Sequence, residues 1–300
     1  MNNIAINTNN TILKHLTPIL ALVNPLTSDM VINPDGRVFI YENYKSPYCV
    51  KCPITEKSLE RIAYMLASIS GKSLNAQSPY LSAIIPKYNY RVEILIPPAV
   101  KKISMSIRIP QSNLVSLDNL YNKQMFSKET MELLKTLVKQ KKNIIISGET
   151  GSGKTTLLSA LINEIDNSER LIIIEEETKE INTNNENVVS IITNKNSFTG
   201  QEAVRSSLRM NPDRIIYGET RDGASCLEML KAWRTGHNGG LATIHSTNAK
   251  GTKGRIEDLL LEVCPFKMDS LINDSLDVVI QVGFENDKRI IKEILELKNK

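Results

Sequence analysis

Apolar and polar residues alternate along two short stretches in the first third of the chain. One face of the first stretch holds Tyr90, Val92, Ile94 and Ile96, and one face of the second holds Ile103, Met105, Ile107 and Ile109. A period of two is that of a half-buried β-strand. The same alternation places Arg91 and Arg108 on the opposite faces, available to solvent or to a neighbouring domain. The pattern alone favours solvent.

Two further elements are predicted before these strands. The sequence Asn-Pro-Asp-Gly at 33–36 is a turn motif, since Pro fixes φ and Gly accepts a positive φ. Apolar runs at 30–32 and 38–41 flank it and indicate a hairpin. From 56 to 70 the apolar residues recur at helical spacing, which predicts an amphipathic helix. Residues 1–110 are therefore expected to form a small α+β domain.

The pattern changes after residue 110. Polar residues dominate 111–124, which we interpret as a linker. Beyond it, apolar runs alternate with helical patterns, as in a mostly parallel sheet. We expect strands at 143–147, 170–174, 188–192, 214–217 and 241–245, with 278–282 and 290–294 closing an edge. Thr199 with Glu202 forms a predicted capping box and Asp222 a second N-cap, so helices should begin at both. Residues 125–300 are expected to be an α/β domain.

Composition narrows the class of protein only slightly. The chain has 300 residues, of which 41% are apolar and 23% charged, values that exclude bulk disorder. Its net charge of +4 argues for neither nucleic acid nor membrane. No apolar run is long enough to span a bilayer, and Pro18 interrupts the one candidate for a signal peptide. We therefore expect a cytoplasmic protein without a transmembrane segment.

The cysteines include one closely spaced pair. Cys49 and Cys52 have metal or redox spacing, but a zinc site needs a second pair and none follows. We interpret them as two reduced loop thiols, and leave a functional role as the lesser alternative.

The segment Gly-Glu-Thr-Gly-Ser-Gly-Lys-Thr, residues 148–155, matches the phosphate-loop pattern in full. Its glycines, Gly148, Gly151 and Gly153, let backbone N–H groups converge on a phosphate, and the dipole of the helix expected at 155–165 adds to this attraction. Lys154 can reach the β- and γ-phosphates, and the Thr155 hydroxyl can bind magnesium. The strand before it and the helix after it favour a nucleotide site over a glycine-rich turn.

Such a loop needs an acidic partner at the end of a nearby strand. The run 214–217 leads to Glu219, which would lie at the carboxyl edge of the sheet beside the phosphates. The run 171–174 ends in Glu175, Glu176 and Glu177, with Glu180 beyond. Adjacent glutamates repel one another, so this cluster is either catalytic or a solvated acidic loop.

Residues 236–248 bring a third polar group to a strand end. His245 follows an apolar strand, level with the phosphate loop. His237, Gly239 and Gly240 precede the same strand, and together they suggest an edge that senses phosphate. A lone histidine at such a place is more often packing than chemistry, and that alternative stays open.

These features, in this order, resemble the secretion (traffic) ATPases of type II and type IV secretion, most of all the TrbB-type conjugative-transfer ATPases. GETGSGKTT resembles their Walker A motif and extends it to Thr156; residues 176–181 resemble the Asp box, 208–221 the Walker B region and 235–245 the His box. The N-terminal segments 33–37, 84–86, 97–98 and 106–108 fit as well. Glu177 stands where the family usually has aspartate, and the tetracysteine module of some type II relatives is absent.

The resemblance implies a RecA-like P-loop NTPase domain at 125–300, preceded by a smaller α+β domain, in an α/β protein that forms a hexameric ring. It assigns ATP and Mg²⁺ as cofactors, with Thr155 and Glu219 at the metal. It also makes Glu219 the carboxylate that activates water, assisted by Glu176 and Glu180, and makes His245 a γ-phosphate sensor. Further expected ligands or charge-stabilising groups are Arg108, Arg91, Arg209 and Arg221, with Gly148, Glu149, Thr150, Gly151, Ser152, Gly153, Lys154, Thr155 and Thr156 around the phosphates.

The expected function is ATP hydrolysis that powers conjugative DNA transfer, or type IV secretion and pilus biogenesis, at the inner face of the cell membrane with channel proteins as partners. A pilus assembly or retraction motor and a nucleotide-gated scaffold are the alternatives. Strong direct binding of nucleic acid is not expected, since the chain lacks a basic-aromatic stretch. Cargo, the general base and the arginine that acts between subunits are left open.

Overall fold

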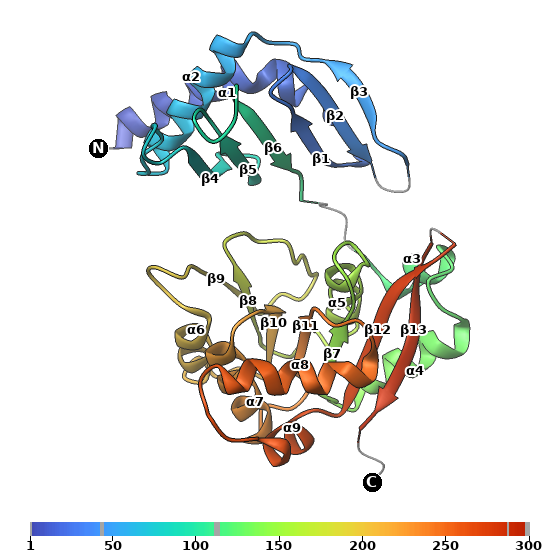
Figure 1. The fold of residues 1–300 in the computed structure, drawn as a ribbon. Helices are drawn as coiled ribbons and strands as arrows, with labels where there is room; N and C mark the ends of the chain where they lie inside the picture. Colours follow the sequence, from blue (N-terminus) through green and yellow to red (C-terminus); the bar gives the residue numbers. More distant parts are fainter. Residues whose placement is uncertain (1, 43–44, 111–114, 287, 298–300) are drawn as a thin grey trace. The chain divides into compact units, whose positions relative to one another are not determined.

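A computed structural model describes residues 2–42, 45–110, 115–286 and 288–297, with side chains from residue 11 onward. The chain divides into two compact units, 1–112 and 113–300 (Figure 1). One hydrophobic cluster fills the first unit, and two clusters fill the second.

The first unit is a six-stranded antiparallel sheet with its helices on one face (Figure 1). Its elements are α1 (Asn2–Leu20), β1 (Thr27–Ile32), β2 (Arg37–Glu42), β3 (Tyr48–Lys51), α2 (Glu56–Ile69), β4 (Tyr80–Ile85), β5 (Tyr90–Leu95) and β6 (Ser104–Arg108), with strand order β3-β2-β1-β6-β5-β4. The β1–β2 hairpin and helix α2 confirm the predictions from the turn motif and the apolar stripe. The alternating residues of β5 and β6 are buried as expected, because they face the helices.

Helix α1 was not predicted, since Pro18 was considered only as an interruption of a candidate signal peptide. Pro18 lies in its last turn, where the loss of one N–H costs at most one hydrogen bond. Ile12, Leu16 and Ile19 form a helical stripe that is completely buried in the core of the first unit. The stripe therefore overrides the local effect of the proline.

The segment 111–124 is not all linker. Residues 111–114 lie outside the described residues, but 117–122 form helix α3 (Leu117–Asn122), which begins at a capping box on Ser116. Leu117 and Leu120 are buried in a core cluster of the second unit. The predicted linker is thus wrong over this helix, because two apolar residues are enough to anchor a short helix whose other positions are polar.

The second unit contains a seven-stranded sheet with helices on both faces. Its strands are β7 (Ile144–Ser147), β8 (Leu171–Glu176), β9 (Val188–Thr193), β10 (Arg214–Thr220), β11 (Leu241–Ile244), β12 (Val278–Glu285) and β13 (Lys288–Glu296), in the order β13-β12-β7-β11-β10-β8-β9. All are parallel to their neighbours except β13, which pairs antiparallel with β12. The predicted α/β class and these strands are confirmed.

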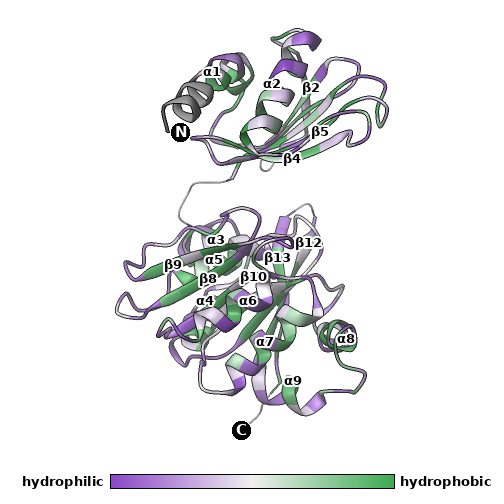
Figure 2. Cartoon of the chain, turned by 90° about the vertical axis from the view of Figure 1, so that its left-hand side faces the viewer, coloured by the Kyte–Doolittle hydropathy of each residue, from purple (hydrophilic) through white to green (hydrophobic). Residues whose placement is uncertain are grey.

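The helices of this unit explain why its strands read as continuous apolar runs. One cluster joins the sheet to α3, α4 (Lys128–Lys139) and α5 (Lys154–Ile162). The other joins it to α6 (Gly200–Ser207), α7 (Gly223–Arg234), α8 (Ala249–Leu261) and α9 (Asp269–Ser275). Both faces of the central strands are therefore buried, and these strands are mostly hydrophobic (Figure 2). Thr199 and Asp222 cap α6 and α7 as predicted.

The parallel strands give the sheet two distinct edges. We call the edge at the carboxyl ends of β7, β8, β10 and β11 the P-loop edge, and the edge where these strands begin the opposite edge. Glu176, Glu219 and His245 all occur at strand ends, so the topology gathers them at the P-loop edge. No helix among the described residues is long and apolar enough to cross a bilayer.

Candidate nucleotide site

The loop between β7 and α5 has a backbone that its glycines make possible. Gly151 and Gly153 have φ of 77° and 97°, in the left-handed region that side chains disfavour. A Cβ on Gly148 would lie 2.5 Å from the carbonyl oxygen of Val282, on the neighbouring strand β12. The loop therefore fits closely against the sheet and presents its exposed residues Glu149, Thr150 and Gly151 outward.

Lys154 is folded back over this loop. Its buried ammonium donates hydrogen bonds to the carbonyl oxygens of Gly148 and Glu149, both at 3.0 Å. The Ser152 hydroxyl donates to the Glu149 carbonyl at 2.8 Å. Burial lowers the pKa of Lys154. Thr155 and Thr156 are half-buried in the first turn of α5.

A continuous chain of polar contacts runs from Lys154 along the P-loop edge. Lys154 Nζ lies 3.4 Å from His245 Nδ1, and His245 Nε2 lies 3.0 Å from Glu219 Oε1. Arg221 donates to Glu219 Oε2 at 2.8 Å and to Glu176 Oε2 at 3.1 Å. We call these five residues the polar chain. It joins side chains from α5, β8 and β10 and from the loops after β10 and β11, and it spans 91 residues, the interval between Lys154 and His245.

Burial and neighbouring charges shift the pKa values of Glu219, Arg221 and His245 in the polar chain. Burial opposes ionisation of Glu219, but hydrogen bonding and attraction from Arg221 outweigh it and lower the pKa of Glu219. Glu219 in turn raises the pKa of Arg221. Burial, and then the nearby Lys154 ammonium, lower the pKa of His245. At neutral pH the chain therefore holds an ionised carboxylate beside a neutral imidazole.

The structure places two of the predicted acidic residues differently. Glu176, at the end of β8, belongs to the polar chain. Glu180 is exposed in the loop beyond β8, and its backbone N–H donates to Glu175 Oε1 at 2.7 Å. Glu219 was found because an apolar strand leads straight into it, and β10 extends past it to Thr220.

Within a single subunit, Arg209 and His237 lie away from the residues of the polar chain. Arg209 is exposed after α6 and precedes β10, so it lies toward the opposite edge. His237 precedes β11, at the opposite edge from His245. The expectation of two histidines at one phosphate-sensing edge is therefore wrong, because a parallel strand carries its preceding and following residues to different edges.

The glycines beside His237 serve packing. A Cβ on Gly239 would lie 2.7 Å from Arg214 Nη1, and one on Gly240 would lie 1.9 Å from Trp233 Nε1. These positions make room for a buried guanidinium and an indole ring. They do not contribute to the phosphate loop.

Arg91 and Arg108 are neighbours in the first unit. They face each other across the β5–β6 pair, and Arg91 Nε lies 3.1 Å from Glu93 Oε1. Arg108 is exposed and Arg91 is half-buried. Both lie on the side of the sheet that the helices leave uncovered, as the alternation indicated. Their role at a nucleotide stays a prediction.

Two residues of the site were missed from the sequence. Arg289, on β13, donates from Nε to the Gly151 carbonyl at 3.0 Å, and its Cδ would be 3.2 Å from a Cβ on Gly153. Nothing near Arg289 in the sequence marks it, since the contact comes from the return strand of a hairpin. Glu175 was noted only as one of three glutamates, but it is buried beneath the Asp-box segment.

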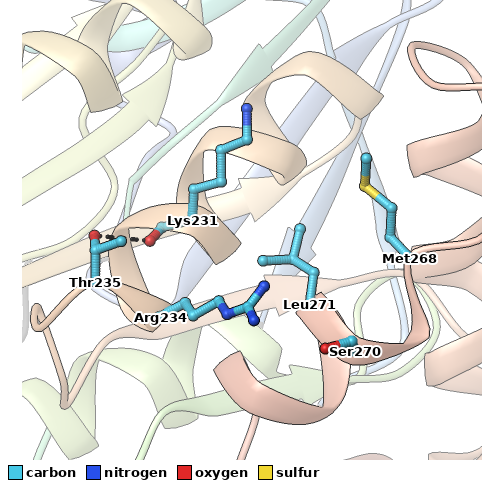
Figure 3. A pocket seen from close by; sticks show the side chains of 6 residues that line it. All are labelled: Lys231, Arg234, Thr235, Met268, Ser270 and Leu271. Carbon is cyan, nitrogen blue, oxygen red and sulfur yellow. Dashed lines mark hydrogen bonds between the residues drawn. The ribbon is translucent and has the colours of Figure 1, made fainter.

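Two other features lie apart from this site. Cys49 and Cys52 are free thiols, and Cys49 is on strand β3 rather than in the predicted loop. A shallow cavity of about 560 Å³ lies between α7 and the start of α9 (Figure 3), and it is lined by Lys231, Arg234, Thr235, Met268, Ser270 and Leu271. Its two cations are already paired, Lys231 with Glu228 and Arg234 with Asp274.

The residues at the P-loop edge fit a nucleotide-bound magnesium ion. Among the described residues no three His, Cys, Asp or Glu side chains are grouped to hold a metal by themselves. Mg²⁺ bound with phosphates needs only one or two protein ligands, since water and phosphate oxygens fill the rest. The Thr155 hydroxyl and the ionised Glu219 carboxylate, which lies close enough to Lys154 to affect its pKa, are of that kind.

Comparisons with known proteins identify the family to which the chain belongs. The family described as "Type II/IV secretion system protein" matches residues 14–285. The conjugal transfer protein TrbB of Rhizobium radiobacter is 33% identical over 282 residues, covering 93% of this chain and 86% of that protein. The type IV secretion system protein VirB11 of Bartonella quintana is 35% identical over 280 residues, 79% of this chain and 78% of that protein.

Solved structures give the same fold. The VirB11 ATPase from the Brucella suis type IV secretion system, in complex with sulphate, superposes with a TM-score of 0.50 at 25% identity, covering 98% of this chain and 96% of that one. The Legionella pneumophila ATPase DotB has a TM-score of 0.64 at 19% identity, covering 97% of this chain and 80% of that one. The latter likeness shows the fold alone.

Proposed function

The chain belongs to the family of type II/IV secretion system proteins, and from that premise we propose that it is a magnesium-dependent ATPase which powers transfer through a type IV secretion or conjugation apparatus. The observation that carries this proposal is the polar chain, which connects the phosphate-loop lysine to Glu219 through His245. The likeness to TrbB supports conjugative transfer as the process served.

The phosphate loop supplies binding. Backbone N–H groups of the glycine loop and the N-terminus of α5 would hold the phosphates, and Lys154 would exchange its two carbonyl partners for phosphate oxygens. Thr155 and Glu219 would hold Mg²⁺, which draws negative charge from the phosphates. Ser152 in the loop and Thr156 in the first turn of α5 would complete the set of residues around the phosphates.

The polar chain supplies catalysis. Glu219 is ionised and held from both sides by Arg221 and His245, so it can accept a hydrogen bond from the attacking water and align it with the γ-phosphorus. Neutral His245, between Lys154 and Glu219, contacts both the phosphate-binding and the water-orienting group. It is therefore suited to report the γ-phosphate to the rest of the sheet edge.

The proposal also includes the assembly in which the subunit works. We infer a homohexameric ring at the inner face of the cell membrane, bound to channel proteins, in which Arg108 and Arg91 close over the nucleotide and Arg209 acts toward a neighbouring subunit. The names of the relatives, conjugal transfer and type IV secretion proteins, support this setting. The fold likeness to the pilus retraction motor PilT, at 19% identity, gives no separate argument for a pilus motor.

Steady-state ATP turnover, with and without the channel partners, tests the proposal. Lys154→Ala and Glu219→Gln should each reduce kcat by about a hundredfold or more, since the first removes the cation at the transferred phosphoryl group and the second removes the charge that orients the water. Glu186→Gln, an exposed carboxylate in the loop before β9, is the matched control and should leave kcat unchanged. A wild-type protein that binds ATP but does not turn it over would favour the nucleotide-gated scaffold. Light scattering with a non-hydrolysable nucleotide tests the ring, which a strict monomer would contradict.

A further inference from the structure

Glu175 is a buried carboxylate directly below the polar chain. It and Glu176 are the last two residues of β8, and successive strand residues point to opposite faces. Glu176 reaches Arg221, whereas Glu175 is only 5% exposed and faces the segment that follows the strand. We call residues 177–181 the Asp-box turn.

The Glu175 carboxylate holds this turn closed. Its Oε1 accepts hydrogen bonds from the backbone N–H groups of Glu180 at 2.7 Å and Ile181 at 2.8 Å. The turn begins at Glu177, whose φ of 63° reverses the chain. The side chain of Ile181 is buried. A single oxygen atom therefore fixes the far end of the turn onto the strand from which it departs.

The neighbouring strand is shaped to admit Glu175. A Cβ on Gly218 of β10 would lie 3.2 Å from Glu175 Cγ and 3.3 Å from the Ile174 carbonyl oxygen. The Gly218 carbonyl accepts a hydrogen bond from the Thr243 hydroxyl at 2.6 Å. On the other side, the Thr193 hydroxyl donates to the Glu175 carbonyl at 3.1 Å. Glu175 is thus enclosed between β9, β10 and the Asp-box turn.

Burying a carboxyl group at this position costs free energy. Its Oε2 is buried and has no hydrogen-bond partner among the described residues. Burial raises the pKa of Glu175 to about 7, against the two backbone N–H groups that lower it; of the nearby charges, Glu180 raises this pKa and Lys179 lowers it. A leucine would fill similar space without burying a carboxyl group, but it would leave both N–H groups without this acceptor. The useful property of the carboxylate is its acceptance of the two N–H groups.

We propose that Glu175 is a positioning residue for ATP hydrolysis: it fixes the Asp-box turn and thereby places the carboxylate of Glu180 relative to Glu176 and Arg221. This inference rests on the proposed ATPase activity. In this proposal Glu175 touches no atom that reacts during hydrolysis, and it acts only through the backbone of the turn.

The test compares Glu175→Leu, which removes the acceptor, with Glu175→Gln, whose amide oxygen can still accept both N–H groups. Glu175→Leu should lower kcat by about tenfold or more with the KM for ATP within about twofold, because the phosphate loop is untouched. Glu175→Gln should restore most of kcat. Glu186→Gln, in the loop that follows β8, is the control for loss of a carboxylate.

Thermal unfolding separates positioning from stability. The pKa of Glu175 is raised in the folded protein, so its contribution to stability is fully present below pH 4.5 and is lost as pH rises through about 7. The Tm of Glu175→Leu should therefore rise relative to that of wild type between pH 5 and pH 8, against the constant cost of two lost hydrogen bonds. A merely structural residue would lose kcat in proportion to its loss of Tm, whereas this variant is expected to stay slow at pH 8, where its Tm is most favourable.

Hydrogen exchange at the amides of Glu180 and Ile181 completes the test independently of turnover. Faster exchange in Glu175→Leu than in wild type and Glu175→Gln supports the proposal. Unchanged exchange, or a folded Glu175→Leu with wild-type kcat, overturns it. Failure of the proposed function has a different signature, since wild type and Lys154→Ala would then hydrolyse ATP equally or not at all while the exchange results still decide whether Glu175 holds the turn.

Discussion

The two edges of the seven-stranded sheet carry the same kinds of side chain in opposite surroundings. At the opposite edge, Arg214 is buried, with 2% of its side chain exposed, and it binds Glu169 through two hydrogen bonds at 2.7 and 3.0 Å. At the P-loop edge, Arg221 is 52% exposed and divides its guanidinium between Glu219 and Glu176. Both are arginines beside carboxylates, but one arrangement is closed and the other is open to a ligand.

The comparison teaches that burial and the completeness of hydrogen bonding distinguish a structural arginine from a functional one better than residue type does. Arg214 also donates to the Val138 carbonyl at 3.0 Å, and Gly239 leaves space for it. Its hydrogen bonds are made within the fold, so it stabilises the start of β10. About half of the Arg221 side-chain surface is exposed and can contact a ligand.

The largest effect should come from Arg214→Ala. It leaves Glu169, 12% exposed, with Lys141 at 2.8 Å as its one ion-pair partner among the described residues. We expect a loss of about 3 kcal/mol in the free energy of unfolding, because one partner of a buried pair is removed. Denaturant unfolding of the whole chain measures it, and Lys141→Ala, at an exposed side chain, should cost less than about 1 kcal/mol. An Arg214→Ala protein as stable as wild type would break the distinction between the edges.

Arg221→Gln should have the reverse profile. We expect kcat for ATP to fall by about a hundredfold, since Glu219 and Glu176 lose the cation they share. Stability should change by less than about 1 kcal/mol because the side chain is exposed. Arg205→Gln is the matched control: it also breaks an exposed pair, with Glu228 at 3.0 Å, and should leave kcat unchanged. Equal kcat in the two variants would remove Arg221 from the catalytic group.

The smallest effect sharpens the account of the glycines. Gly239 and Gly236 both have positive φ, 82° and 111°, but only at Gly239 would a Cβ meet Arg214. Gly239→Ala should cost about 2 kcal/mol and Gly236→Ala about 1 kcal/mol, the difference being the displaced guanidinium. Chemical denaturation of both variants gives this difference. If it vanishes, Arg214 can move aside freely and the opposite edge is less rigid than described.

Local features were predictable from the sequence, and contacts between distant elements were not. The strands around the phosphate loop are short apolar runs buried on both faces, so their pattern was sufficient. Glu219 and His245 were predictable because each follows such a run. His237 was assigned to the wrong edge, since a motif gives the order of residues but not the strand end at which each lies. Helix α1 was missed although Ile12, Leu16 and Ile19 recur at helical spacing.

The remaining parts of the site depend on topology. Arg289 meets Gly151 only because β12 lies next to β7 and β13 next to β12, pairings that no local pattern specifies. The three adjacent glutamates could not be told apart until β8 set their alternation, with Glu175 inward and Glu176 toward Arg221.

The contacts of the β12–β13 hairpin with the phosphate loop have a practical consequence for protein engineering. Val282 closes the space beside Gly148, and Arg289 holds the Gly151 carbonyl. A truncation that removes β13 would therefore strip a support from the nucleotide loop, although the deleted strand is at the border of the sheet. Variants in which this region is shortened or fused to another protein should retain the whole hairpin.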